Sequence, residues 1–240
     1  MPSNLNAETS RSGTERAARL KFRIAEAGLD LFLSEGFDNV TVDAVAAAAG
    51  VSRRTVFRHF ATKDEIPFPD HDERQAMQRS YLAAASGAGN PLDVLAEAAK
   101  LVLSDFLRNR ELVLKRYQLT KADSRVRERE IIENDRYTRN ARRFLATASL
   151  GGPSASADII AGMFDTAHRS TLANWVRSGG TTDAVTELEE GLAWILGTLE
   201  PQRTSLGDRM QPLAVDELVL AVLPATGETY ALIDRIRRLL

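Results

Sequence analysis

The sequence predicts an all-α protein, and three observations support this. Apolar residues recur every three or four positions along most of the 240 residues, which is the spacing of one face of a helix. No run alternates apolar and polar residues between turn signals, as a strand would. Hydrophobic residues make up 44% of the chain, enough to bury a globular core beneath these helices.

Composition excludes several classes of function. The chain has no cysteine, so disulfides, thiolate catalysis and cysteine-bound zinc are ruled out. The start, "MPSNLNAETSRSGTE", lacks the apolar core of a signal peptide, and the apolar runs are shorter than the ~20 residues of a membrane span. We therefore expect a cytoplasmic protein without membrane association. Because the net charge is −2, any binding of nucleic acid must depend on a local basic patch.

The first 66 residues predict a short polar arm followed by three helices. Residues 1–13 are rich in polar residues and predict a disordered arm. The first helix begins at Thr14 and ends before Gly36, where a left-handed residue is usual. Its apolar stripe consists of Leu20, Ile24, Ala27 and Leu31. The domain formed by residues 14–66 is small, so its helices must pack tightly on this stripe.

Two short helices follow within this domain. Thr41 is a candidate N-cap for the second helix, which Gly50 ends. Ser52 is a candidate N-cap for the third helix, which runs to about Phe60. Thr62 with Glu65 has the spacing of a capping box at the start of another turn.

Residues 67–240 predict a larger helical domain. Pro67 and Pro69 interrupt the chain at its start. Asp70 with Glu73 then repeats the capping-box spacing and restarts the helix. We expect helices at 70–85, 91–109, 111–119, 124–149, 156–178 and 182–199, and two more at 215–223 and 228–240 within an extended tail that begins at residue 200.

The stretch "GVSRRTVFRHFATKDE", residues 50–65, is strongly basic in a chain of negative net charge. Two short helices joined by "AAGVS" and packed on a longer one describe a helix-turn-helix, whose last helix enters the major groove of DNA. On that helix Val56 and Phe60 face inward, so Arg54 and Arg58 face outward. The alternative interpretation is an ordinary solvated helix face.

Each outward residue suits a particular contact with DNA. Arg53 and Arg54 lie in the first turn, where a guanidinium can reach guanine O6 and N7, and Phe57 can touch a thymine methyl. Side chains at helix ends suit phosphate oxygens, and these are Thr41, Thr55, His59 and Lys63. The exposed helix N-termini at Thr41 and Ser52 also favour an anion.

The stretch "AEAGLDLFLSEGFDNVTVDAVAAAAGVSRRTVFRHFATKDEI" resembles the DNA-binding domain of the TetR family of transcriptional regulators. The resemblance covers roughly residues 16–66. It implies a fold of nine or ten helices, a homodimer built on the last two, and a ligand pocket in the larger domain. The DNA-contacting positions that match are Thr41, Ser52, Arg53, Arg54, Thr55, Phe57, His59 and Lys63. Two features depart from the family pattern: the Pro67–Pro69 break and the long tail after Glu200.

The resemblance implies that some aromatic residues of the larger domain line a cavity, although each alone is equally typical of a core. We expect Phe106, Tyr117, Phe164 and His168 to line it. The walls should be chiefly aromatic and aliphatic with few charges, and should suit an apolar or amphipathic molecule with one polar end. The stripe Leu188, Leu192, Ile195 and Leu199 is expected to pack against a symmetry mate in a homodimer joined mainly through residues 156–178 and 182–199. The alternative is that it only lines the core of one chain.

The function expected from these features is a ligand-responsive regulator of transcription, which in such a family is most often a repressor. It would bind a near-palindromic double-stranded DNA operator as a homodimer and respond to a small-molecule effector, with no cofactor and no enzymatic activity. An activator or a ligand-independent regulator is the nearest alternative. A metal-dependent hydrolase that uses His71, Asp72 and His168 is the alternative from another class.

Overall fold

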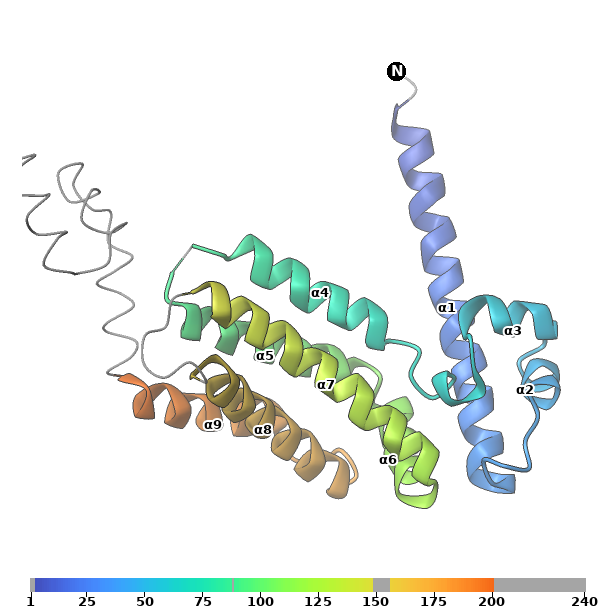
Figure 1. The fold of residues 1–240 in the computed structure, drawn as a ribbon. Helices are drawn as coiled ribbons and strands as arrows, with labels where there is room; N and C mark the ends of the chain where they lie inside the picture. The colour runs from blue at the N-terminus through green and yellow to red at the C-terminus, as the bar shows by residue number, and fades with distance from the viewer. Residues whose placement is uncertain (1–2, 88, 149–155, 201–240) are drawn as a thin grey trace, which may run out of the picture.

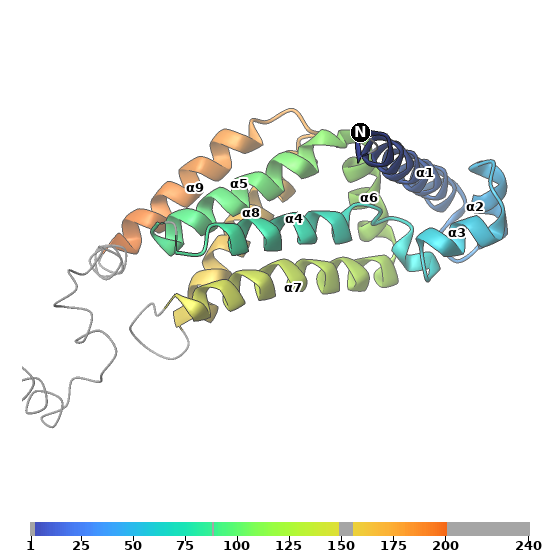
Figure 2. The same ribbon diagram turned by 90° about the horizontal axis from the view of Figure 1, so that it is seen from above.

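The computed structural model describes residues 3–87, 89–148 and 156–200, and in this part of the chain every regular element is a helix. The elements are α1 (Ser3–Glu35), α2 (Val42–Ala48), α3 (Arg53–His59), a short 3-10 helix η1 (Lys63–Glu65), α4 (His71–Ala84), α5 (Pro91–Arg108), α6 (Arg110–Ala122), α7 (Ser124–Thr147), α8 (Ser156–Arg177) and α9 (Ala184–Thr198). The helices α1–α3 form a head at one end, and α4–α9 form an elongated body (Figures 1 and 2). The all-α prediction is confirmed.

The predicted disordered arm is wrong for residues 3–13, because α1 already begins at Ser3. This segment contains no proline, and Gly13 costs only ~1 kcal/mol relative to alanine inside a helix. A helix that is already nucleated by the packed turns further along extends backward at little cost. The predicted end of α1 is confirmed, since Gly36 follows it with φ of 88°.

The predicted caps of the two short helices in the head are confirmed. Thr41 Oγ1 accepts a hydrogen bond from Ala44 N at 3.1 Å, and Ser52 Oγ accepts one from Thr55 N at 3.1 Å. Gly50 has φ of 63°, which ends α2 and turns the chain into α3. The capping box at Thr62 is wrong: its side chain makes no cap bond. Glu65 instead accepts from Ala61 N at 2.7 Å.

The hydrophobic core of the head extends beyond residues 14–66. Helices α1–α3 bury Ile24, Leu29, Phe32, Val45, Val56 and Phe60. The same cluster includes Leu112 and Leu119 of α6 and Val126 of α7. Ion pairs join the two parts as well: Lys21 with Glu73 at 3.0 Å, Lys115 with Asp30 at 2.6 Å, and Arg125 with Asp38. Head and body are therefore packed directly on each other.

The segment between head and body is buried, although it is not helical. η1 ends at Glu65 and α4 begins at His71, so the predicted break at Pro67 and Pro69 is confirmed. Residues 66–70 are all buried. Ile66 is fully buried, and a methyl group on Gly28 of α1 would lie only 2.6 Å from Ile66 Cγ2. The segment is therefore firmly seated against α1.

Asp70 does not cap α4, which corrects the capping box predicted there. Its side chain makes no bond to the backbone of the first turn. Asp70 Oδ2 instead accepts from Arg74 Nη2 at 2.5 Å, and Glu73 pairs with Lys21 of α1. Burial explains this outcome, because Asp70 is only 4% exposed. A buried carboxylate without a positive partner costs more free energy than a helix start without a side-chain cap.

The body helices lie close to their predicted positions, and one prediction about them is corrected. Leu188, Leu192 and Ile195 of α9 are 0–4% exposed and belong to the core of this chain, so this stripe does not face a partner. Of the predicted residues, the tail and its helices at 215–223 and 228–240 lie outside the described part. Among the described helices, none is long and apolar enough to cross a membrane.

Candidate DNA-binding surface and ligand cavity

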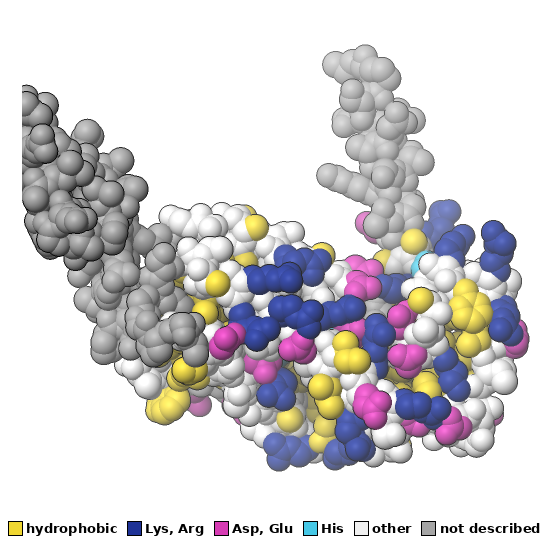
Figure 3. Space-filling view, in the orientation of Figure 1, with side chains coloured by type: hydrophobic (Ala, Val, Ile, Leu, Met, Phe, Trp, Pro, Cys, Tyr) yellow, Lys and Arg dark blue, Asp and Glu magenta, His cyan; other side chains and the backbone are white. Residues whose placement is uncertain are grey.

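Helix α3 is anchored on one side and exposed on the other, as predicted. Val56 and Phe60 are 1% and 3% exposed and pack into the head core. Arg53, Arg54, Phe57 and Arg58 are exposed. Lys and Arg side chains are prominent on the surface of the head (Figure 3). The anchored residues fix the rotation of α3, and the exposed side chains form a basic surface.

The arginines of α3 differ in their partners. Arg53 Nη1 pairs with Asp43 of α2 at 2.6 Å, and its guanidinium lies 5.3 Å from the centre of the Phe57 ring. Within the described residues, neither Arg54 nor Arg58 has an ion-pair partner. These two residues are four positions apart, so they lie on one face of the helix. Their charges are available to an anion without the loss of an existing pair.

Hydroxyl groups at the helix starts lie beside this surface. Thr41 is exposed at the start of α2, and Ser52 is exposed at the start of α3. Thr55 Oγ1 lies 2.9 Å from Ser52 Oγ. Each hydroxyl that accepts a backbone bond can still donate its own proton, so the capping role of Thr41 and Ser52 is compatible with a phosphate contact.

Lys63, one of the predicted phosphate ligands, contacts the loop between α1 and α2. Its Nζ donates to Phe37 O at 2.6 Å and to Val40 O at 3.0 Å, and lies 4.4 Å from the centre of the Phe37 ring. These contacts close the loop between α1 and α2 and half-bury the side chain. The sequence could not reveal them, because the two carbonyls lie more than twenty positions earlier in the chain.

His59 is half-buried at the end of α3. Its Nε2 is buried and has no hydrogen-bond partner among the described residues. Burial lowers the pKa of His59, and the charges of Arg58 and Lys21 lower it further. The imidazole is therefore neutral near pH 7 and would contact DNA as a neutral hydrogen-bonding group.

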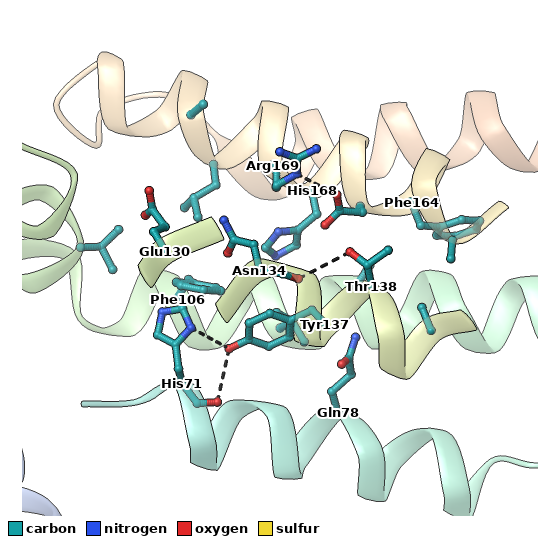
Figure 4. A pocket seen from close by; sticks show the side chains of 18 of the residues that line it. His71, Gln78, Phe106, Glu130, Asn134, Tyr137, Thr138, Phe164, His168 and Arg169 are labelled. Carbon is teal, nitrogen blue, oxygen red and sulfur yellow. Dashed lines mark hydrogen bonds and ion pairs between the residues drawn. The ribbon is translucent and has the colours of Figure 1, made fainter. Parts of the chain in front are cut away.

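A cavity of about 250 Å³ lies in the body among α4–α8 (Figure 4). All four predicted residues, Phe106, Tyr117, Phe164 and His168, line it. Aliphatic side chains form much of the remaining wall, and they are Leu95, Ala99, Val102, Val113, Ala141, Ala161, Leu172, Ala173 and Val176. This part of the wall suits an apolar ligand group.

The cavity wall is more polar than the sequence predicted. His71, Gln78, Arg116, Glu130, Asn134, Tyr137, Thr138, Asp165 and Arg169 also line it. His71 and Tyr137 approach from α4 and α7 and lie near each other, with Tyr137 Oη 3.4 Å from His71 Nδ1 (Figure 4). The expectation of few inward charges is therefore wrong.

Arg116 is one of the cavity residues that the sequence analysis missed. Its side chain is 3% exposed, and it lies between the buried residues Leu112 and Leu119 on one face of α6. A signal was present, since an arginine at the fourth position after a buried leucine interrupts an apolar stripe. Its partner was not predictable, because Asp70 lies 46 positions earlier.

The charges around Asp70 determine the electrostatics of this end of the cavity. Burial alone would raise the pKa of Asp70, but the guanidiniums of Arg116 and Arg74 offset this and hold it well below its usual range. Arg74 Nε also donates to Asp105 Oδ2 at 2.8 Å, and its guanidinium lies 3.6 Å from the centre of the Phe106 ring. Asp70 is thus a permanently charged carboxylate shared by two arginines.

Three other titratable groups here, His168, His71 and Tyr137, are neutral near pH 7. Burial lowers the pKa of His168 to about 4, and burial with the charge of Arg116 lowers that of His71 well below its usual value. Burial raises the pKa of Tyr137 above its usual value. Burial also raises the pKa of Glu130, against the opposing effects of Arg116 and Thr120.

The arrangement does not favour the metal-dependent hydrolase. His71 is 2% exposed and faces the cavity, whereas the side chain of the neighbouring Asp72 is 80% exposed and pairs with Arg136. Asp72 therefore points away from the cavity that His71 and His168 line. Among the described residues, no three His, Cys, Asp or Glu side chains are grouped so that they could hold a metal ion.

Comparisons with known proteins agree with this geometry. The model of bacterial regulatory proteins of the tetR family matches residues 24–66. A Mycobacterium tuberculosis protein that carries the name mycofactocin biosynthesis transcriptional regulator MftR is 38% identical over 73 residues, 30% of this chain and 36% of that protein. The HTH-type transcriptional regulator TcmR of Streptomyces glaucescens is 34% identical over 88 residues, 35% of this chain and 38% of that protein. The chain thus matches little more than a third of the length of either relative.

A solved structure extends the likeness to the body. The crystal structure of Thermus thermophilus FadR, a TetR-family transcriptional repressor in complex with lauroyl-CoA, aligns with a TM-score of 0.51. The alignment has 22% sequence identity and covers 73% of this chain and 93% of that one. At this identity the comparison establishes a shared fold, in which a helix-turn-helix head is joined to a helical body.

Proposed function

We propose that the chain, whose residues 24–66 match the model of bacterial regulatory proteins of the tetR family, is a ligand-responsive repressor of this family that binds a palindromic operator as a homodimer. The single observation that carries the DNA-binding part is the outer face of α3. It presents Arg54 and Arg58 to solvent without ion-pair partners in the described chain, while Val56 and Phe60 anchor the opposite face. A helix with these charges on one face suits the major groove.

Operator binding by an Arg54 variant tests this assignment. The operator is first selected from random double-stranded DNA with the full chain, and affinity is then measured by fluorescence anisotropy. Arg54→Ala should weaken operator binding by ~1–3 kcal/mol and relax the preference at one base pair in each half-site. Arg108→Ala, which removes an 80% exposed side chain from the body, is the matched control and should stay within about twofold. If the operator affinity of Arg54→Ala also stays within twofold of the unmodified chain, then α3 is not the recognition helix.

We propose that the cavity binds the effector, a small amphipathic molecule. Support comes from a cavity wall that combines aliphatic and aromatic side chains with polar ones. The FadR relative is described with lauroyl-CoA, an amphipathic ligand, in the same fold. Such a molecule regulates only if it binds the DNA-competent and incompetent states with different affinity. A coupling of ~1–3 kcal/mol would change operator affinity about 5–150-fold.

The surface that we propose for dimerisation is the outer face of α8 and α9. Ile159 of α8 is 57% exposed and Trp194 of α9 is 68% exposed. The two helices pack closely, since a methyl group on Gly191 would lie 3.7 Å from Ala167 Cβ. Large apolar side chains that remain exposed on one face are typical of an interface. A two-fold dimer would place two α3 helices about one turn of DNA apart, ~34–36 Å, and would therefore read a palindrome.

A further inference from the structure

The part of the cavity wall near the start of α4 contains a buried cation, the guanidinium of Arg116, whose charge is only partly neutralised. Arg116 Nη1 lies 3.4 Å from Asp70 Oδ1, but Asp70 also pairs with Arg74 at 2.5 Å. Among the described residues, Arg116 has no other ion-pair partner. A buried guanidinium is costly unless its donors are paired, and the one carboxylate within ion-pair distance of Arg116 is shared with Arg74. Arg116 lines the cavity, so a ligand can supply that acceptor.

Two imidazoles of the same cavity also lack partners. The Nε2 atoms of His71 and His168 are buried and make no hydrogen bond within the described chain. Both rings pack on Phe106, with centroid separations of 5.6 Å and 5.8 Å. Most buried polar atoms in native proteins are paired. When the hydroxyl of Tyr137 donates to His71 Nδ1, the ring proton lies on Nε2 and serves as a donor to the cavity.

We propose that this end of the cavity binds the carboxylate of a small amphipathic acid, with Arg116 as the charged donor and His71 and His168 as neutral donors. A guanidinium presents two parallel N–H groups that match a carboxylate. The inference rests on the proposed function, because it names the chemical class of the effector. Apolar side chains that line the cavity, such as Leu95 and Val102, would contact the hydrocarbon part.

The volume of the cavity limits the length of the acid's hydrocarbon chain. A volume of about 250 Å³ corresponds to about eight water molecules at ~30 Å³ each. It is below the ~300–1,000 Å³ of typical drug-sized sites. A chain of six to ten carbons is therefore the expected size, and octanoate is a suitable probe.

Glu130 is the residue that argues for a different ligand. Its carboxyl group lines the same end and would attract an ammonium group. Burial raises the pKa of Glu130, and the charge of Arg116 opposes this rise. Arg74 already pairs with both Asp70 and Asp105, so Arg116 is the guanidinium that a ligand in the cavity can reach. The buried Nε2 atoms of His71 and His168, which lack partners among the described residues, are further candidate donors, and donors favour an acid over an amine.

A series of probes with the same hydrocarbon tail tests the proposal on the unmodified full chain. Binding of octanoate, octan-1-ol and octylamine is measured by calorimetry at pH 7, together with the six- and ten-carbon members of each class. Octanoate should bind at least tenfold more tightly than the alcohol and the amine. Equal affinities, tightest binding of the amine, or no binding by any member would overturn the proposal.

Variants test the roles of the named side chains. Arg116→Gln should weaken octanoate binding at least tenfold and change octan-1-ol binding less than twofold. Arg169→Gln is the matched control, because Arg169 lines the cavity but its side chain is 55% exposed and paired with Asp165. If circular dichroism shows that Arg116→Gln is unfolded, His168→Leu takes its place and should weaken octanoate at least threefold. Equal losses for acid and alcohol would overturn the assignment.

A separate measurement distinguishes this inference from the proposed function. Operator affinity is followed while octanoate is added to the protein–DNA complex. If octanoate binds at least tenfold more tightly than the alcohol but leaves operator affinity unchanged, the carboxylate site stands and the regulatory role of the cavity fails. A lower operator affinity that octan-1-ol reproduces at equal occupancy supports the regulatory role and overturns the need for a carboxylate.

Discussion

Arg116 Nη1 lies 3.4 Å from Asp70 Oδ1, so a side chain of the cavity directly contacts the segment that leads into the head. His71, another cavity residue, follows Asp70 immediately. At the other end of the segment, Ile66 is fully buried in the head core. Since residues 66–70 are all buried, a displacement of Arg116 by a ligand would reach α1 through packed atoms. We infer that the proline-containing segment couples the two parts.

The first prediction concerns the charge of Asp70. Asp70→Asn should lower the free energy of unfolding by ~3–5 kcal/mol, because it leaves the buried guanidiniums of Arg74 and Arg116 without their shared counter-charge. Urea denaturation followed by circular dichroism measures this. Asp72→Asn is the control two positions away, where the side chain is 80% exposed, and should change stability by less than ~0.5 kcal/mol. Similar effects of the two substitutions would contradict the role assigned to Asp70.

The second prediction concerns pH. The pKa of His168 is about 4 in the folded protein, against 6.5 for an unperturbed histidine, so between these values the unfolded chain takes up a proton that the folded chain does not. The stability contributed by neutral His168 is complete above pH 6.5 and decreases as the pH falls toward 4, by up to ~3 kcal/mol. His71 acts in the same direction because burial also keeps it neutral.

Denaturation at a series of pH values tests this. His168→Phe should reduce the loss of stability between pH 6.5 and 4, because phenylalanine has no proton to gain and can pack on Phe106. His71 and His59 should account for the slope that remains. If His168→Phe and the unmodified chain lose stability equally over this range, then His168 is not the group that resists protonation.

Features that depend on neighbours in sequence were predictable. The caps at Thr41 and Ser52 satisfy backbone N–H groups within three residues, and Gly36 adopts a positive φ that ends α1. Each feature depends on the residue type at one position, so the sequence predicts it. The apolar periodicity located α5–α9 closely for the same reason. Four predicted cavity residues also line the cavity, since aromatic residues on inward faces of body helices have few other places to lie.

Features that depend on distant residues were not predictable. The capping-box spacing at Asp70 and Glu73 is local, but Arg116 and Lys21 compete for these carboxylates across 46 and 52 positions. Lys63 bonds two carbonyls of the preceding loop, contacts that its prediction as a phosphate ligand did not include. At Asp70 and Glu73, burial and tertiary contacts outweigh a local capping preference of ~1 kcal/mol.

The third prediction separates the roles of Lys63 and Arg58. Lys63→Gln should lower the free energy of unfolding by ~1–3 kcal/mol, because it removes charged hydrogen bonds to Phe37 O and Val40 O. Arg58→Gln should leave stability within ~0.5 kcal/mol and reduce the slope of log affinity against log salt by about one, because it removes one phosphate contact. Denaturation and salt-dependent operator binding are measured for both variants. If Lys63→Gln gives a shallower salt slope with unchanged stability, then Lys63 contacts phosphate and does not stabilise the loop.

The last prediction concerns the dimer. The α9 stripe predicted to face a partner is buried in its own chain, so Leu192→Ala should lower the free energy of unfolding by ~2–5 kcal/mol through the cavity that it leaves.

Trp194 is 68% exposed on the same helix. Trp194→Glu should therefore preserve the folded chain while placing a charge, repeated by two-fold symmetry, within the proposed interface. Light scattering should give a dimer for the unmodified protein and a monomer for Trp194→Glu at the same micromolar concentration. Since a monomer cannot span two half-sites, Trp194→Glu should also lower operator affinity, although α3 is unchanged. A Trp194→Glu protein that remains a dimer would place the interface elsewhere on the molecule.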